Sequence, residues 1–221
     1  MSIADKLTTI AENEKKVYDA GKKAEYDAFW DNAITNGDRV AIGTGAFAGR
    51  SWNDATFNPP IKVIIPYNCN YCFYNNGCTT IAGKAEIVAT ALNNGFQYST
   101  IKHIGTVDMS NCTASTSAFA TNVIVSIEKI ISSEKTVWHS TTFNNASSLE
   151  ELFIEGKIGQ NGFNVQWSTK LTHESLMSII NALYDYKDSG KTYTVTLGTE
   201  NLAKLTDAEK AIATQKGWTL A

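Results

Sequence analysis

Apolar positions recur through the middle of the chain at a nearly constant spacing. Four phenylalanines follow one another at almost equal intervals, and a small residue precedes each of them. Two further columns of small or aliphatic residues keep the same register. The columns are Phe73, Phe96, Phe119 and Phe143; Cys72, Gly95, Ala118 and Thr142; Cys78, Ile101, Ile124 and Leu149; and Ile81, Ile104, Ile127 and Leu152. Four columns that agree over four copies predict a repeat unit of about 23 residues.

A unit of this length can form one short strand and a turn, and it cannot bury its apolar side alone. Stacked copies place identical columns above one another, so that phenylalanine lies on phenylalanine and isoleucine on isoleucine. The sequence therefore predicts an α/β solenoid with a continuous core.

The last unit carries the strand signature Leu-x-x-Leu-x-Ile at Leu149, Leu152 and Ile154, and the turns are polar and contain the phenylalanine. These features resemble BspA-type leucine-rich repeats, a bacterial family of extended recognition surfaces. The resemblance covers residues 57–160. It implies a leucine-rich-repeat-like, right-handed stack of short parallel strands. The whole chain looks like repeat proteins encoded in gut Firmicutes genomes and their prophages.

Residues 1–37 are expected to form an N-terminal helical cap that stops at Asn36-Gly37. The second half of this helix has one broad aromatic face, suited to covering the first layer of the stack; its members are Tyr26, Phe29, Trp30 and Ala33. The first half has a heptad-like seam with one polar position, made of Ile3, Leu7, Ile10, Glu14 and Val17. Packing along its own domain and self-association are the two alternatives for this seam.

Residues 38–160 form the predicted array, which starts with an irregular turn over 38–68, where Ile61, Val63 and Ile65 alternate as a strand. Residues 161–221 are predicted to be a C-terminal strand-helix cap that continues the array and shares its sheet. Within this cap we expect strands at 164–167, 192–197 and 218–220, a helix from Thr172, and a helix started by the capping box Thr206-x-x-Glu209.

Strand geometry separates core from surface, because successive side chains of a strand point to opposite faces. If the Ile104 column points inward, its neighbours point outward, and these outward columns vary while the core is constant. Such variation is typical of a recognition surface. The expected binding residues are Thr80, His103, Ser126 and Glu151 before the core column, with Glu128 and Phe153 after it. Phe153 could instead lie under the C-terminal cap.

Charge and hydropathy exclude several classes of protein. The formal net charge is −3, so the basic footprint of a nucleic-acid-binding protein is missing. No apolar run approaches the roughly 18 residues that suggest a membrane span. The first residues lack the basic and then apolar layout of a signal peptide. We therefore expect synthesis in the cytoplasm, followed by incorporation in a phage particle or, as an alternative, display at the cell surface or outside the cell.

Four cysteines, Cys69, Cys72, Cys78 and Cys112, could indicate a metal site or a disulfide. The repeat register favours simple packing, because Cys72 and Cys78 occupy columns that are otherwise small or aliphatic. We expect no metal and no cofactor.

The residues that could carry catalysis lack a recognisable arrangement. His103, His139 and His173 have no nucleophile at a motif spacing. Glu150 and Glu151, with Glu128 and Glu155 nearby, could in principle serve a glycosidase, but exposed carboxylates on a sheet are more often solvated. We expect no catalytic residue and no enzyme, and a glycan-acting enzyme is the third choice of function.

These observations favour a non-enzymatic recognition protein that uses the exposed strand face of the array. Its expected partner is a protein or glycan on a cell surface, with no nucleic acid and no membrane insertion, and self-association through the N-terminal helix is an additional hypothesis. The resemblance favours a phage or prophage structural or host-recognition component; a bacterial surface or secreted adhesin is the alternative.

Overall fold

The computed structural model describes residues 87–221 without interruption. Before residue 87 it describes residues 71–74 and 80–81, the helical residues 9, 12–17, 19–21 and 24, and the strand residues 35–36, 39–41, 56–57 and 62–64. Tyr26, Phe29, Trp30, Ala33, Ile3, Leu7 and Ile10, expected to form the helix faces, lie outside the described residues, as do Cys69, Cys78, Ile61 and Ile65. Glu14 and Val17 of the proposed seam are exposed.

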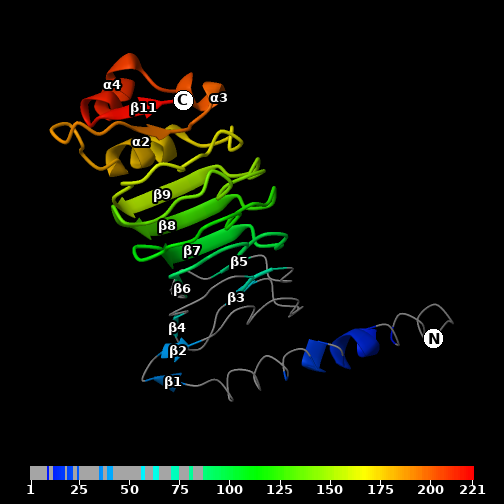
Figure 1. The fold of residues 1–221 in the computed structure, drawn as a ribbon. Helices are drawn as coiled ribbons and strands as arrows, with labels where there is room; N and C mark the ends of the chain where they lie inside the picture. Colours follow the sequence, from blue (N-terminus) through cyan, green and yellow to red (C-terminus); the bar gives the residue numbers. More distant parts are fainter. Residues whose placement is uncertain are drawn as a thin grey trace.

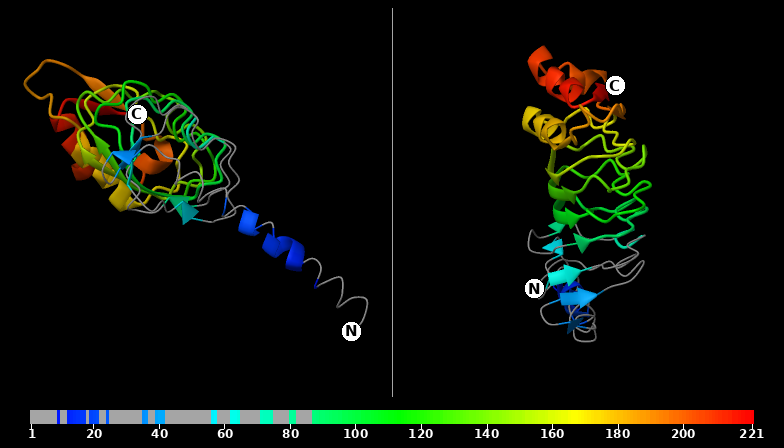
Figure 2. Two further views of the ribbon diagram at one scale, coloured as in Figure 1. Left: turned by 90° about the horizontal axis from the view of Figure 1, so that it is seen from below. Right: turned by 60° about the vertical axis from the view of Figure 1, so that its left-hand side comes forward.

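The centre of the molecule is a parallel sheet in which each strand is one repeat later than its neighbour (Figure 1). Its order is β3 (Thr56–Phe57), β5 (Thr80–Ile81), β7 (His103–Asp108), β8 (Ser126–Ser132) and β9 (Glu151–Gly156), and β6 (Ile87–Val88) pairs with the end of β7. Ile81 pairs with Ile104, Ile104 with Ile127, and Ile127 with Leu152. The predicted strand register is therefore confirmed, and Figure 2 shows successive turns of the chain lying over one another.

The register extends further toward the N-terminus than the sequence predicted. β2 (Arg39–Ala41) pairs in parallel with β4 (Lys62–Ile64), and β3 pairs in parallel with β5, so each strand meets a partner one repeat later in the chain. The strand expected around Val63 is confirmed by β4, whereas the prediction of an irregular turn was wrong for β2 and β3, which already keep the repeat. No phenylalanine stands 23 residues before Phe73 in the sequence, and the register of these strands could therefore not be recognised from the phenylalanine spacing.

The end of the predicted N-terminal helix was also wrong. Residues Thr35–Asn36 form β1, which pairs antiparallel with β2. Only Gly-Asp stands between these strands in the sequence, and such a pair is a common signal for a two-residue hairpin. The glycine was interpreted as a helix stop because Asn and Gly also favour the residue that follows a helix.

The phenylalanine column forms a continuous stack of buried rings. Neighbouring ring centroids lie 4.8, 5.2 and 5.3 Å apart from Phe73 to Phe143, with interplanar angles of 3°, 11° and 12°. Phe163 extends the stack at 5.6 Å in a tilted orientation. All of these rings are fully buried, so the predicted aromatic core is confirmed for the described turns.

Backbone hydrogen bonds explain why the phenylalanines keep their register. The amide N–H of Phe73, Phe96 and Phe119 donates to the carbonyl oxygen of the small residue before the next phenylalanine, in each case at 2.8 Å. Two residues before these phenylalanines, Tyr71, Asn94 and Ser117 have positive φ angles of 59°, 53° and 53°. One turn conformation therefore recurs once per repeat, and it joins neighbouring turns through the backbone as well as through the rings.

Burial along the strands departs from the simple two-residue alternation that the sequence suggested. In β7 the buried Ile104 and Val107 are three residues apart, and β8 has the same spacing. In the preceding copy the partners of these two positions, Ile81 of β5 and Ile87 of β6, are six residues apart. Two short strand segments per turn have thus merged into one longer strand in β7 and β8.

The sheet ends at β9, where a helix replaces the next strand. Helix α2 (His173–Ala182) lies beside β9 (Figure 1), and its side chains bond the free edge of that strand. The amide N–H groups of Leu152 and Ile154 donate to the hydroxyls of Ser175 and Ser178, at 3.0 and 2.9 Å. The expected C-terminal cap does adjoin the array, but the prediction that it shares the sheet was wrong.

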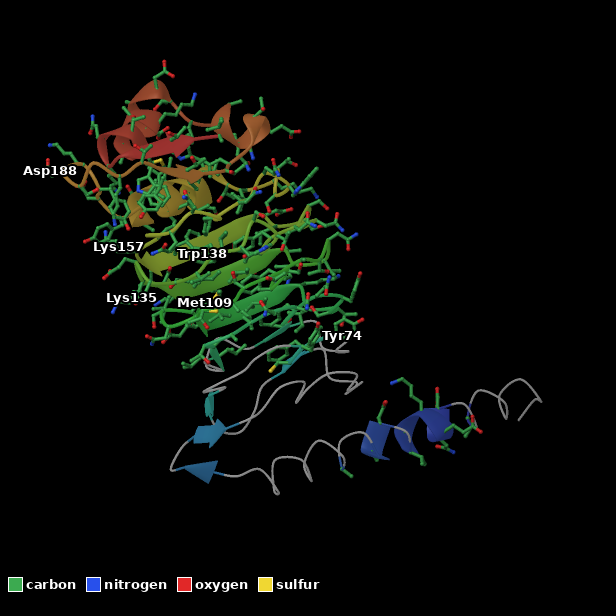
Figure 3. All side chains as sticks on the ribbon, viewed as in Figure 1. Tyr74, Met109, Lys135, Trp138, Lys157 and Asp188 are labelled. Carbon is green, nitrogen blue, oxygen red and sulfur yellow. The ribbon has the colours of Figure 1, made fainter. Side chains whose placement is uncertain are left out.

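The last layers contain α3 (Thr199–Leu202), α4 (Asp207–Gln215) and a separate parallel pair, β10 (Tyr193–Val195) and β11 (Trp218–Leu220). The predicted capping box at Thr206 and Glu209 is present, and α2 begins after Thr172 as expected. The predicted strand over 164–167 was wrong: Asn164 makes only an isolated bridge with Thr196, and the next residues form a turn. Figure 3 shows Asp188 in a loop that projects from this end of the molecule.

Candidate recognition surface

The outer face of β7, β8 and β9 presents a mixed set of polar, charged and aromatic side chains above a uniform core. The strand register brings Thr80, His103, Ser126 and Glu151 into one row, as the repeat predicted. Adjacent strands of a sheet are spaced by about 4.8 Å, so the members of this row are direct neighbours. The four residues of the first predicted row therefore lie side by side across the sheet.

Two members of this row are less accessible than expected. Ser126 is only 8% exposed and Thr80 is half-buried, whereas His103 and Glu151 are exposed. The Nδ1 atom of His103 lies 2.9 Å from the hydroxyl oxygen of Ser126, so the larger imidazole ring forms a hydrogen bond with its neighbour in the adjacent strand. Ser126 is thus a support for His103, and the prediction that it is an exposed contact residue was wrong.

The second predicted row is displaced by a bulge. Between Ile127 and Ile130 the pairing of β8 with β9 shifts by one residue, so two residues of β8 face Phe153 of β9. Those residues are Glu128, which is exposed, and Lys129, which is half-buried. Phe153 is 37% exposed. The alternative that it lies under the C-terminal cap is therefore not observed.

A salt bridge crosses the surface beside Phe153. The ammonium of Lys129 lies 2.6 Å from a carboxylate oxygen of Glu155. Both side chains are substantially exposed, so this pair contributes little to stability. Lys129 was not predicted to belong to this surface, because the β-bulge that places both Glu128 and Lys129 opposite Phe153 has no local signal in the sequence. We call the residues Glu128, Lys129, Glu151, Phe153 and Glu155 the strand-face patch.

The His103–Ser126 contact does not have the order of a catalytic triad. In such a triad the histidine stands between the nucleophile and the acid, so that one ring nitrogen meets each of them. Here the row runs Thr80, His103, Ser126, Glu151, and the serine lies between the histidine and the carboxylate. The hydroxyl therefore holds the imidazole in place without being activated by a histidine that a carboxylate orients.

The other titratable side chains considered for catalysis or metal binding are either buried or paired with a neighbouring side chain. Cys72 and Cys112 are buried, and burial raises the pKa of the Cys112 thiol. His173 lies 2.8 Å from Glu209, and the His139 ring bonds Thr141 at 2.8 Å. Within the described residues, no group of three or more His, Cys, Asp or Glu side chains could hold a metal ion. In the same part of the chain, no helix has the length and apolar character needed to cross a bilayer.

Comparison with protein-family models, with curated proteins and with solved structures finds no match to this chain.

Proposed function

We propose that the chain is a non-enzymatic recognition protein, and that its repeats form a right-handed, leucine-rich-repeat-like solenoid of the BspA type. One observation carries this proposal: the buried column is nearly constant while the row beside it is not. Ile104, Ile127 and Leu152 are equivalent core residues. Their preceding neighbours, His103, Ser126 and Glu151, differ in charge, size and hydrogen-bonding chemistry. A scaffold with a fixed core and a varied face is suited to binding.

The chemistry of the strand-face patch favours a protein partner with basic and apolar side chains. Three of its five residues are carboxylates, and the single lysine is already paired with Glu155. Phe153 supplies an exposed aromatic ring between them, and aromatic side chains often dominate the energy of binding sites. Carboxylates around the ring would meet Lys or Arg on the partner, and the apolar contact would be made at the centre.

For the biological setting we propose a phage structural or host-recognition component. The resemblance to prophage-encoded repeat proteins supports this setting. A bacterial surface or secreted adhesin is the alternative, and a glycan-acting enzyme ranks third. The His103–Ser126–Glu151 order supports placing the enzyme last.

The test is retention of the purified protein on immobilised peptides that differ in net charge and aromatic content. We expect basic peptides with apolar residues to bind best, and we expect binding to weaken as salt is raised, since exposed charge pairs are screened. The double substitution Glu151→Lys and Phe153→Ser should abolish this retention. Glu134→Lys reverses one exposed charge outside the patch and serves as the matched control. Equal binding by the double variant and the control would reject the strand-face patch as the contact surface.

A further inference from the structure

One tryptophan of the C-terminal cap is exposed in a way that the other described tryptophans are not. Trp138 and Trp218 are 4% and 1% exposed, whereas Trp167 is 55% exposed. Burial of an aromatic side chain of this size is worth a few kcal/mol, so a folded chain usually covers it. Trp167 belongs to none of the strand rows, and the proposed strand-face function does not use it.

The indole of Trp167 lines a shallow hollow of about 400 Å³. This volume lies within the range of small-molecule sites, roughly 300–1,000 Å³. The other residues that line the hollow come from the turn after Phe163, from the segment around α3, and from Ala221, which follows β11. The polar ones are Gln166, Thr169, Thr196, Thr199 and Glu200. Four of these five side chains are uncharged, and each of those four carries both a hydrogen-bond donor and an acceptor.

A single buried side chain holds the walls of the hollow together. Asn201 is fully buried, and its amide nitrogen donates toward the carbonyl oxygens of Val165, Ser168 and Leu197, at 3.4, 3.2 and 2.9 Å. Val165 and Ser168 are the residues immediately before and after the Gln166–Trp167 pair. The amide of Asn201 therefore fixes the turn that presents the indole against the segment that forms the opposite wall.

Lys204 and Gly198 add to this fixation. The ammonium of Lys204 donates to the carbonyl oxygens of Thr169 and Leu171, at 2.7 and 2.8 Å, and to the side-chain oxygen of Asn201 at 3.1 Å. Gly198 has a φ of +84°, and a Cβ atom there would lie 3.0 Å from the Cα of Gln166. Glycine thus allows the two walls to approach closely. A rigid site loses little conformational entropy when it binds a ligand.

We propose that this hollow binds a neutral saccharide. The face of an indole ring carries negative electrostatic potential, and it attracts the weakly positive C–H groups on the flat side of a sugar ring. The surrounding amide and hydroxyl groups match sugar hydroxyls, which also donate and accept. The carboxylate of Glu200 can accept from one or two of these hydroxyls. This inference is independent of the strand-face patch, since the two sites share no residue.

A cationic ligand is the competing possibility, because an indole face together with a carboxylate also attracts cations. The composition of the hollow argues against it. Among the described residues that line it, Glu200 has the only charged side chain and Trp167 the only aromatic ring. The uncharged hydrogen-bonding side chains outnumber the one carboxylate and the one aromatic ring. Their donor groups would find no acceptor on an ammonium group, which only donates.

The experiment is a glycan array that carries neutral and charged oligosaccharides, followed by calorimetric titration of the best neutral binder. We expect dissociation constants between micromolar and low millimolar, as suits a shallow site. Trp167→Ala should weaken binding roughly tenfold or more, and Gln166→Ala should weaken it less. Because the indole is exposed, Trp167→Ala should fold with a nearly unchanged Tm. Binding should also change little with salt, since a neutral ligand forms no charge pair.

Tyr98→Ala is the matched control, since it removes another exposed aromatic ring far along the chain, and it should bind the saccharide like the wild type. Three results would overturn the proposal: no neutral saccharide bound up to about 10 mM, binding that Trp167→Ala leaves intact, or a preference for choline or a lysine peptide that falls as salt is raised. Phe153→Ser should not affect saccharide binding, so failure here is distinguishable from failure of the strand-face proposal.

Discussion

Three phenylalanines of the column, Phe73, Phe96 and Phe119, join neighbouring turns both through their rings and through their backbone N–H groups. The ring of Phe119 stacks on Phe96 and on Phe143, and its amide N–H donates to Thr142 in the next turn. The contribution of one such residue is therefore shared between three successive turns. A substitution in this column should therefore change the stability of the whole stack, and not only the strength of one local contact.

Phe119→Ala should lower the free energy of unfolding by about 3–5 kcal/mol, the usual range for a core aromatic residue. The loss of ring contacts on both sides leaves a cavity that the stacked backbone cannot close. Denaturant unfolding followed by circular dichroism measures this change. Phe153→Ala, which removes an exposed ring, should cost much less. A thermal midpoint for Phe119→Ala that matches the wild type would contradict the assigned register.

Ser168→Ala should leave stability unchanged or raise it slightly. Ser168 is fully buried, and its hydroxyl has no hydrogen-bond partner among the described residues. A buried hydroxyl without a partner costs about 1–3 kcal/mol relative to a satisfied one, so its removal relieves that cost. Thermal unfolding provides the measurement, with Ser175→Ala as the contrast. Ser175 bonds the edge of β9, and its loss should be destabilising.

At the scale of elements, local signals in the sequence predicted more than long-range ones. The starts of α2 and α4 were predicted from Thr172 and from the capping box of Thr206 and Glu209, because a cap needs only residues within one helical turn. The position of α2 beside β9 could not be predicted, since it depends on hydrogen bonds to a strand in the preceding repeat. The false strand over 164–167 arose because Val165 and Trp167 alternate with polar residues.

One of the two candidate sites could be predicted from the sequence, and the other could not. The row from Thr80 to Glu151 could be predicted because one period relates all its members. The hollow beside Trp167 could not, because its walls are distant in the sequence and are joined by Asn201 only in the folded chain. The burial of Ser126 and its hydrogen bond with His103 were not predicted, because both depend on the packing of side chains from different strands.

Acid should weaken the last layer through Glu209. The backbone N–H and the hydroxyl of Thr206 both donate to its carboxylate, and they hold the pKa of Glu209 below its ordinary value of 4.5, with a smaller contribution from His173. The ionised form is thus favoured in the folded state. Its stabilising effect is present above the unfolded-state pKa, and it is lost as the pH falls through the lowered folded-state pKa.

Glu209→Gln should accordingly be less stable than the wild type near neutral pH. The difference should shrink as the pH falls below the ordinary value and vanish once the pH lies below the lowered folded-state pKa of Glu209. Tm values measured across this range give the result. In a Thr206→Ala background the same substitution should have a smaller effect, because the hydroxyl donor is removed while the backbone N–H donor remains. This double-mutant cycle measures the coupling between the Thr206 hydroxyl and the Glu209 carboxylate. A difference that persists unchanged into acid would reject the assignment.

At the scale of the whole molecule, the parallel strands β3, β5, β7, β8 and β9 pair in chain order, and the layers that follow β9 are built differently. The sheet stops where Ser175 and Ser178 bond the edge of β9, and α2 and α4 then lie against each other. Several contacts join the two helices at this end. His173 meets Glu209, and the ammonium of Lys216 donates to the carbonyls of Ile180 and Asn181. The C-terminal end is therefore closed against addition of a further strand to the main sheet.

The N-terminal helix should cause the chain to self-associate. The described members of its seam, Glu14 and Val17, are exposed. The part of the helix that carries the seam has roughly 20 residues, and an isolated helix of about that length is only marginally stable in water without an apolar partner. We expect the full chain to sediment as an oligomer at micromolar concentration and a shortened chain that begins at Ala24 to be a monomer. If the full chain also sediments as a monomer, the seam packs against its own domain and the proposed tether is wrong.

The hydrogen bond that Phe73, Phe96 and Phe119 each donate to the following turn has a consequence for how such a chain can evolve. The residues on both sides of a one-repeat segment, such as 97–119, meet equivalent neighbours in the turns before and after it. A gene that duplicates or loses one such segment would still encode a chain whose ends join in register. Each event would change the length of the exposed face by one strand spacing, about 4.8 Å. The number of repeats would thus set the length of the exposed face, and this number could change in evolution independently of the side chains that determine which partner is bound.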